Sequence, residues 1–147
     1  MSTSPRSDSA DFSAGGVVIR GDEVAVIVPV KRAADGSRVL GLPKGHPDGD
    51  ETAEQAAARE VAEESGVVAE LVDELGEVAY RVQRRDGPVD KVVRYYRFRY
   101  VSGDVSDHDH EIEEARWMPL AQAAEQLTHV GEREMVKRAL LRTAPDR

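Results

Sequence analysis

Residues 52–65 constrain this chain most, because they can form only one kind of secondary structure. The stretch is rich in alanine and glutamate and holds neither glycine nor proline, a composition that strongly favours an α-helix. Gly66 follows directly, at the position where a glycine commonly ends a helix. The preceding segment, 43–50, contains two prolines and two glycines and predicts an irregular loop. The fold must therefore contain an irregular loop that leads directly into this helix.

The remaining segments predict strands and two further helices around that unit. β-Branched residues dominate 16–20 and 24–30, and the turn dipeptide Gly21–Asp22 between them predicts a hairpin. Further strands are predicted at 39–42, 67–83, 91–101 and 115–118, and helices at 120–127 and 132–142. Strands and helices are interleaved without a regular repeat, so we expect an α/β fold with a mixed sheet flanked by helices.

The length of 147 residues fits a single domain. We expect that domain over residues 12–147. Residues 1–11 are rich in Ser, Pro and Asp and predict a disordered tail.

Three glutamates share one face of the predicted helix 52–65. Glu60, Glu63 and Glu64 are three and four residues apart, so at about 100° per residue they occupy one narrow wedge of its surface. Like charges at these spacings repel one another, and the helix dipole disfavours anions near the C-terminal end. A bound cation would make the arrangement favourable, and hard oxygen ligands suit Mg²⁺ or Mn²⁺. The alternative is an acidic helix face that is simply solvated.

The loop 43–50 indicates what such a cation would act on. Glycine-rich turns and helix N-termini expose backbone N–H groups that favour phosphate, and Lys44 adds a positive charge. A phosphate-binding loop joined to a metal-binding helix indicates metal-assisted phosphoryl chemistry.

The order and spacing of residues in this loop and helix resemble the box of the Nudix hydrolase family. Every position matches, through Gly45, Glu51, Arg59, Glu60, Val61, Glu63, Glu64, Gly66 and Val67. The LPKGH sequence at 42–46 and the segment 111–120 look like those of MutT-type and diadenosine polyphosphate hydrolases. The resemblance implies a Nudix-type α/β/α sandwich with a mixed β-sheet. It also implies an enzyme that hydrolyses a phosphoric anhydride bond in a nucleoside diphosphate linked to another group.

The resemblance implies a role for each box residue. Glu60, Glu63 and Glu64 would hold the divalent cation, Mg²⁺ or Mn²⁺, with the carbonyl oxygen of Lys44 completing the coordination. The residues with implied structural roles are Gly45, Glu51, Arg59 and Gly66, of which Glu51 and Arg59 would brace the loop against the helix.

The attacking water needs a general base, for which the resemblance leaves two sources. One is a glutamate of the box helix, Glu63 or Glu64. The other is a carboxylate on the loop before the last strand, where Glu111 is the first candidate and Glu114 the second. Glu111 is also a candidate metal ligand. All of these acids could instead be solvated loop residues.

Residues outside the box must identify the substrate. The segment 81–99 has seven basic residues and two acidic ones, which would suit a long anion such as a dinucleoside polyphosphate or a diphosphoinositol polyphosphate. Exposed strands with alternating arginines are the alternative explanation. An oxidised nucleoside triphosphate is a further candidate substrate, and tyrosines could stack on its base or pack in the core. The candidate substrate-binding residues are Lys44, His46, Arg32, Tyr80, Tyr96 and Arg94.

Composition narrows the expected partners. The net charge of −8 argues against a nucleic-acid polymer, so we expect a small phosphorylated substrate. No apolar run reaches the length of a membrane span, and the first ten residues lack an apolar core, so we expect a cytoplasmic protein that does not bind membranes. The resemblance also leaves a homodimer open.

Three other functions on the same fold stay open. A non-catalytic nucleotide sensor would usually lack box carboxylates, and none is missing here. Isopentenyl diphosphate isomerase chemistry, as the resemblance would import it, uses a cysteine, and the chain has none. Removal of RNA caps is disfavoured by the net acidity.

Overall fold

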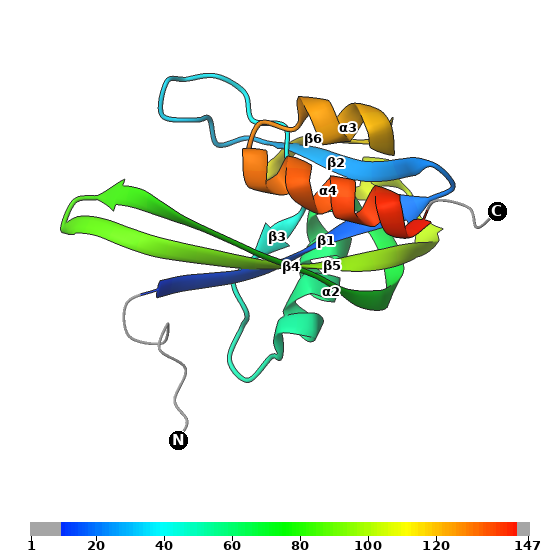
Figure 1. Cartoon of the computed structure of the whole chain (residues 1–147), viewed down its shortest axis with the longest axis horizontal. Helices are drawn as coiled ribbons and strands as arrows, with labels where there is room; N and C mark the ends of the chain where they lie inside the picture. Colours follow the sequence, from blue (N-terminus) through cyan, green and yellow to red (C-terminus); the bar gives the residue numbers. More distant parts are fainter. Residues whose placement is uncertain (1–9, 144–147) are drawn as a thin grey trace.

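The computed structural model describes residues 10–143, and Figure 1 shows strands of one sheet with helices packed around them. The strands are β1 (Ala10–Arg20), β2 (Glu23–Pro29), β3 (Lys44–Gly45), β4 (Val67–Arg84), β5 (Gly87–Gly103) and β6 (Ile112–Pro119). The helices are α2 (Ala53–Ser65), α3 (Leu120–Gln126) and α4 (Val130–Thr143), with a short 3₁₀ turn, η1, at Val105–Asp107. The predicted α/β fold with a mixed sheet is confirmed.

β1 lies inside the sheet, in which the strand order is β4-β5-β1-β2-β6 with β3 paired to β1. β1 runs parallel to β5 over residues 10–19, and its last two residues pair antiparallel with the start of β2. β3 pairs antiparallel with Ala14 and Gly15 of β1. This pairing holds Lys44 and Gly45, the start of the predicted phosphate loop, against the middle of the sheet.

β1 begins earlier than the sequence suggested. Backbone pairing joins Ala10 to Asp90 and Asp11 to Lys91 of β5, so the prediction of a tail over residues 1–11 is wrong for residues 10 and 11. Strand pairing uses backbone groups, which the polar composition of this segment does not reveal. The rest of the predicted tail, residues 1–9, lies outside the described residues.

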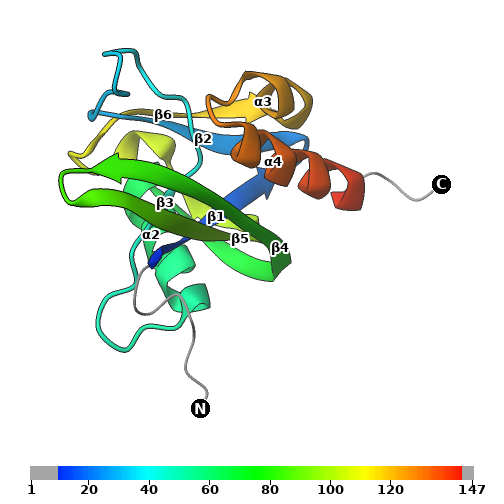
Figure 2. The ribbon, with the colours of Figure 1, turned by 60° about the vertical axis from the view of Figure 1, so that its left-hand side comes forward.

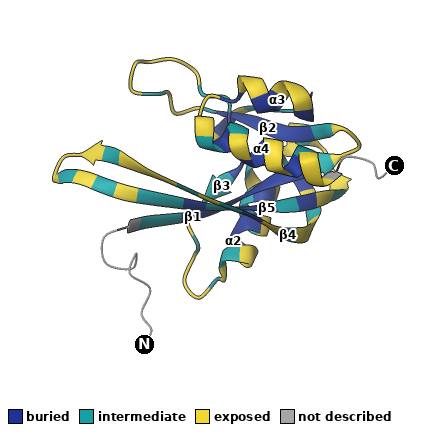
Figure 3. Cartoon of the chain, in the orientation of Figure 1, coloured by how far each residue is buried: buried dark blue, intermediate teal, exposed yellow. Residues whose placement is uncertain are grey.

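The helices cover both faces of the sheet, as Figures 1 and 2 show. Beneath α2, Val61 packs in a buried cluster with Val18 and Phe98. Beneath α3 and α4, a second cluster contains Leu127 and Met135. Figure 3 shows burial concentrated where helices and sheet meet, with exposed residues at the β4–β5 tip and in the loop after β2. Among residues 10–143, no helix combines the length and apolarity that crossing a bilayer requires.

Both ends of α2 are capped by local contacts. The Thr52 side chain accepts a hydrogen bond from the backbone N–H of Gln55, and the Gln55 side chain accepts one from the backbone N–H of Thr52. Thr52 is thus the N-cap, and the helix starts one residue later than predicted. Gly66 ends it with φ +81, a left-handed conformation that favours glycine.

Long-range pairing changes three of the predicted strands. β5 and β6 are longer than predicted, because the ladders with β4 and β2 include polar residues at their ends. The predicted strand at 39–42 is instead one bridge, in which the N–H groups of Gly41 and Ile27 each donate to the other's carbonyl oxygen over 2.8 Å.

Candidate active site

The loop 43–50 crosses the acidic face of α2 near its C-terminal end. The backbone N–H of Lys44 donates to the Glu64 carboxylate over 3.0 Å. Gly45 lies so close to Glu60 that a Cβ atom on residue 45 would overlap the Glu60 carboxylate. A larger residue here would therefore displace the Glu60 carboxylate from its place beside the loop. The sequence thus brings backbone groups of the loop within contact distance of two box glutamates.

Arg59 ties the loop to the helix through one guanidinium group. Its Nε and Nη2 atoms donate to the two carboxylate oxygens of Glu51 over 2.8 and 3.0 Å. Nη2 also donates to the carbonyl oxygen of His46 over 2.9 Å, and Nη1 donates to Glu60 and Glu63 over 3.1 and 3.2 Å. The hydrogen bonds between Arg59 and Glu51 raise the pKa of Arg59 and lower the pKa of Glu51. Both groups therefore stay charged.

Two of the other box carboxylates, Glu60 and Glu64, are poorly solvated, whereas Glu63 is exposed. Burial raises the pKa of Glu64 to about 8, and burial also raises the pKa of Glu60. No group of three or more histidine or acidic side chains within residues 10–143 already stands in a geometry that holds an ion. The chemistry of the donors nevertheless suits a hard divalent cation, because these oxygens are the ligands such ions prefer. A cation here would also offset the cost of keeping buried carboxylates ionised.

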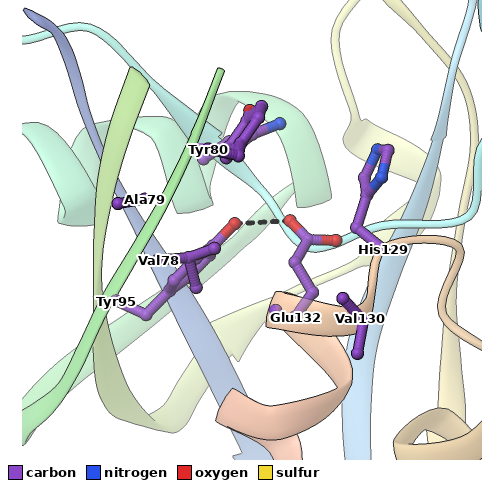
Figure 4. A pocket seen from close by; sticks show the side chains of 9 residues that line it. Val78, Ala79, Tyr80, Tyr95, His129, Val130 and Glu132 are labelled. Atoms are coloured by element: carbon purple, nitrogen blue, oxygen red, sulfur yellow. Dashed lines mark hydrogen bonds between the residues drawn. The ribbon is translucent and has the colours of Figure 1, made fainter. Parts of the chain in front are cut away.

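Two cavities open beside Lys44. The small cavity, of about 360 Å³, lies between β4, β5 and the start of α4, and Figure 4 shows it from close by. The large cavity, of about 910 Å³, is bounded by residues 29–34 and reaches Glu64 and Glu111. Lys44, Tyr80 and His129 line both cavities, so the two lie side by side, and we call them together the cleft.

The segment 104–111 brings Glu111 to the large cavity and Asp109 near the box glutamates. The backbone N–H of Asp109 donates to the carbonyl oxygen of Glu63 over 2.9 Å. The Asp109 charge adds to the effect of burial in raising the pKa values of Glu60 and Glu64. Glu111 lines the large cavity, whereas Glu114 accepts a hydrogen bond from Arg116 over 3.0 Å. Of the two predicted bases on this side, Glu111 is the one that lines the large cavity.

Three of the predicted substrate-binding residues line the cleft. Lys44 and Tyr80 lie where the two cavities join, and Tyr80 is 40% exposed. Arg32 lines the large cavity and forms an ion pair with Glu113 over 3.1 Å.

The other three predicted substrate-binding residues point elsewhere. Tyr96 is buried in the cluster beneath α2, which corrects its assignment to substrate binding. Arg94 lies on the same face of β5 and donates to Glu77 over 2.7 Å, so it too is turned away from the small cavity. Tyr95, between them, is the one that lines the cavity, because side chains alternate along a strand. His46 contacts Asp11 over 2.5 Å.

The basic segment 81–99 is largely neutralised. Six of its seven basic side chains form ion pairs with acids of β1, β4 and β5: Arg81 with Asp90, Arg84 and Lys91 with Asp11, Arg94 with Glu77, Arg97 with Asp73 and Arg99 with Glu70. The structure thus favours the alternative explanation, strands that carry alternating arginines, over a binding surface for a long anion.

Sequence reasoning missed Asp109, which lies near the box glutamates, and two residues that line the small cavity, Glu132 and His129. Asp109 stands in the acidic stretch from which Glu111 was selected, so that stretch was the available signal. Glu132 and His129 have no such signal, because in the sequence they belong to an ordinary amphipathic helix and the turn before it. Only the packing of α4 against β4 and β5 brings them to the small cavity.

Lysine in place of Arg59 is expected to weaken Mg²⁺ binding at the box glutamates by roughly 10- to 100-fold. The ammonium group keeps the charge but cannot contact both oxygens of Glu51 while also reaching Glu60. Calorimetric titration of the protein with Mg²⁺ measures this. Arg81→Lys is the matched control, because the Arg81–Asp90 pair is exposed and far weaker effects are expected from it. Equal titration curves for both variants would contradict the bracing role.

Comparison with known proteins assigns the chain to a family. Residues 11–139 match the model of the NUDIX domain. The chain is 36% identical to the Mycobacterium tuberculosis protein MutT4, over 92% of this chain and 59% of that protein. It is 37% identical to an 8-oxo-(d)GTP phosphatase of Mycolicibacterium smegmatis, over 69% of this chain and 30% of that protein. The chain thus spans less than two thirds of each relative.

A solved structure agrees with these matches. The crystal structure of a MutT NUDIX hydrolase from Burkholderia pseudomallei superposes with a TM-score of 0.70 at 25% identity, covering 88% of this chain and 97% of that one. The family model, the relatives and the superposition agree. The chain therefore belongs to the Nudix family, with MutT-type relatives.

Proposed function

We propose that this protein is a divalent-metal-dependent pyrophosphohydrolase that acts on a nucleotide. One observation carries this assignment: the Lys44 N–H meets the Glu64 carboxylate where the loop, the box helix and the cleft come together. A phosphate group in the large cavity would therefore lie beside the candidate metal ligands. The named activity of the M. smegmatis relative supports the reaction class.

The cation would be held by residues already placed around the end of α2. Glu60, Glu63 and Glu64, with the carbonyl oxygen of Lys44, are its proposed ligands, and Glu111, which lines the large cavity, is a further candidate. When bound, Mg²⁺ or Mn²⁺ supplies neutralisation of the charge on the bridging and leaving phosphate oxygens. Asp109 would add negative charge to the site and so favour cation binding.

Side chains of the protein are the proposed proton acceptor and the proposed contacts to the phosphates and the base. Glu111 lines the large cavity, as Glu64 does, and is the proposed acceptor of the proton from the attacking water, ahead of Glu114. Glu63 or Glu64 is the alternative acceptor. Lys44 and Arg32 are the proposed cationic contacts to the phosphates. Tyr80, at the junction of the cavities, is the proposed contact to the base.

The proposed substrates are nucleoside triphosphates, including oxidised ones, and dinucleoside polyphosphates. The small cavity supports a base as one part of the substrate, because it is lined mainly by apolar and aromatic side chains. The neutralised basic segment 81–99 removes the main argument for a diphosphoinositol polyphosphate.

Product analysis in ¹⁸O-labelled water tests this assignment. With Mg²⁺, we expect turnover of at least one member of a panel of 8-oxo-dGTP, diadenosine tetraphosphate, ADP-ribose and a diphosphoinositol polyphosphate. Mass spectrometry then identifies the broken bond from the phosphorus that carries the label. Removing divalent ions with EDTA is expected to abolish turnover, and added Mg²⁺ to restore it.

Two results would contradict the assignment. Turnover that persists in EDTA would exclude the metal-dependent reaction. Tight nucleotide binding without turnover in Mg²⁺ would favour the alternative, a nucleotide sensor on the same fold.

A further inference from the structure

Strand β6 carries an extra residue, Glu113, beside the large cavity. In the ladder between β2 and β6, Pro29 pairs with Ile112 and Val28 pairs with Glu114. Glu113 is thus inserted between two paired residues, as in a β-bulge. Ile112, directly before it, lines the large cavity. Because a bulge changes the direction of the side chains around it, this insertion determines which way the Glu113 carboxylate points.

The bulge turns the carboxylates of Glu113 and Glu114 toward the same partner. Successive side chains of a regular strand point to opposite faces of the sheet. Here both carboxylates contact Nη2 of Arg38, over 2.7 Å from Glu113 and 3.5 Å from Glu114. The other oxygen of Glu113, Oε1, pairs with Nη2 of Arg32 over 3.1 Å. The inserted carboxylate therefore holds two arginines at once, one on each oxygen.

Arg32 and Arg38 stand on either side of the tip of the loop that follows β2, which Figure 1 shows extending beyond the strand. The tip closes on itself, because the backbone N–H of Ala33 donates to the carbonyl oxygen of Ser37 over 2.9 Å. Arg32 and Ala33 line the large cavity. Since Glu113 holds the arginines on both sides of this tip, it fixes one wall of the cavity against β6.

Arg32 can contact Glu113 and a phosphate together. Its ion pair with Glu113 uses Nη2, and a guanidinium carries five N–H donors, so donors on the other nitrogens remain for a phosphate. The two side chains are 40% and 34% exposed, and a pair this exposed adds little to the stability of the fold. Its larger effect is on binding, because an arginine that is already held loses less side-chain freedom when a ligand arrives.

On the basis of the proposed function, we infer that Glu113 is a positioning residue that holds Arg32 in place for the phosphates of the substrate. Arg38 is the anchor of this arrangement. It pairs with Glu113, and it is not among the residues of 10–143 that line the large cavity. A phosphate that binds Arg32 therefore leaves the pair between Arg38 and Glu113 intact. Glu113 acts on the substrate only through Arg32.

Steady-state kinetics of Glu113→Gln test this inference, with the nucleotide of the panel above that the wild-type protein hydrolyses fastest. The amide keeps the shape of the carboxylate but not its charge, so we expect KM to rise by roughly 3- to 10-fold. The value of kcat is expected to stay within about twofold, because a contact made equally before and during the reaction affects binding alone. In a protein that already carries Arg32→Gln, adding Glu113→Gln is expected to change KM by less than about twofold, since the residue through which Glu113 acts is gone.

Glu23→Gln is the matched control. Glu23 lies at the opposite end of the same ladder, where it pairs with Pro119. Its side chain is 36% exposed and forms an ion pair with Arg20 over 3.3 Å, so its replacement removes the same charge from a similar pair far from the bulge. Both kcat and KM are expected to stay within about twofold of wild type.

The comparison of the two backgrounds separates positioning from a structural role. An unchanged KM in Glu113→Gln, or an equal rise of KM with and without Arg32, would overturn the inference and leave the hydrolase assignment standing. If the wild-type protein hydrolyses no nucleotide, the hydrolase assignment fails. Calorimetric titration with inorganic pyrophosphate in Mg²⁺ then decides on Glu113. Weaker binding by Glu113→Gln that disappears in the Arg32→Gln background supports the positioning role, whereas equal or absent binding by wild type and Glu113→Gln overturns it.

Discussion

Glutamine in place of Glu64 is expected to lower kcat by roughly 10³-fold while the fold stays intact. The amide oxygen can still accept from the Lys44 N–H, so the contact between loop and helix survives. The charge that a cation needs is lost. Because burial raises the pKa of Glu64 to about 8, the carboxylate is costly to keep ionised, and a neutral amide should leave Tm at or above that of wild type. Rates in saturating Mg²⁺ and a metal-free melting curve measure both effects.

Glu54→Gln is the control for this substitution. Glu54 lies in the first turn of the same helix and is exposed, so kcat is expected to stay within about twofold of wild type. Unchanged turnover in both Glu63→Gln and Glu64→Gln would contradict the assignment of the box glutamates as metal ligands.

Alanine in place of Gly66 is expected to lower the free energy of unfolding by about 3 kcal/mol. A left-handed conformation costs an alanine roughly 1–2 kcal/mol, and overpacking adds about 1–3 kcal/mol. The added Cβ would overlap the carbonyl oxygen of Asp104 and come within 2.9 Å of the Asp107 carbonyl carbon. Displacement of this segment should also move Asp109 and reduce activity. Urea unfolding, with the hydrolysis rate of the same preparation, measures both effects.

Gly36→Ala separates the two contributions. Gly36 has φ +87, close to the φ of +81 at Gly66, but a Cβ atom there would meet nothing within 4 Å. Only the conformational cost of about 1 kcal/mol is expected. If the two variants lose equal stability, the contact between Gly66 and segment 104–111 contributes nothing.

Helix α2 and the loop before it could be predicted from the sequence because local rules decide them. Capping by Thr52, the left-handed glycine at 66 and the spacing of the glutamates all operate within one or two turns of chain. The hairpin across Gly21 follows in the same way, since its two strands are neighbours in sequence. The resemblance to the family box also predicted that Glu51 and Arg59 hold the loop against the helix.

The features that could not be predicted from the sequence depend on packing between residues far apart in the chain. Alternation along β5 separates Tyr95 from Tyr96, but the position of α4 determines which of these two side chains faces the cleft. The acids that neutralise the basic segment lie mostly on β1 and β4, and only the ladder between β4 and β5 brings Asp73 beside Arg97. Glu132 reaches its partners Leu42 and Tyr95 in the same way, across sequence separations of 90 and 37 residues.

The outer edge of β4 affects whether copies of this protein aggregate at high concentration. Within residues 10–143 it pairs with no strand other than β5, so the sheet has an open edge there, apart from the carbonyl oxygens of Glu74 and Leu75, which accept hydrogen bonds from Arg142 and Arg138 of α4. Charged pairs such as Glu77–Arg94 stand along it, and its register shifts at three places between Val68 and Gly76. A second chain adding a strand there would have to desolvate the charges and match an irregular backbone. The ion pairs that neutralise the basic segment therefore also protect the open edge against aggregation.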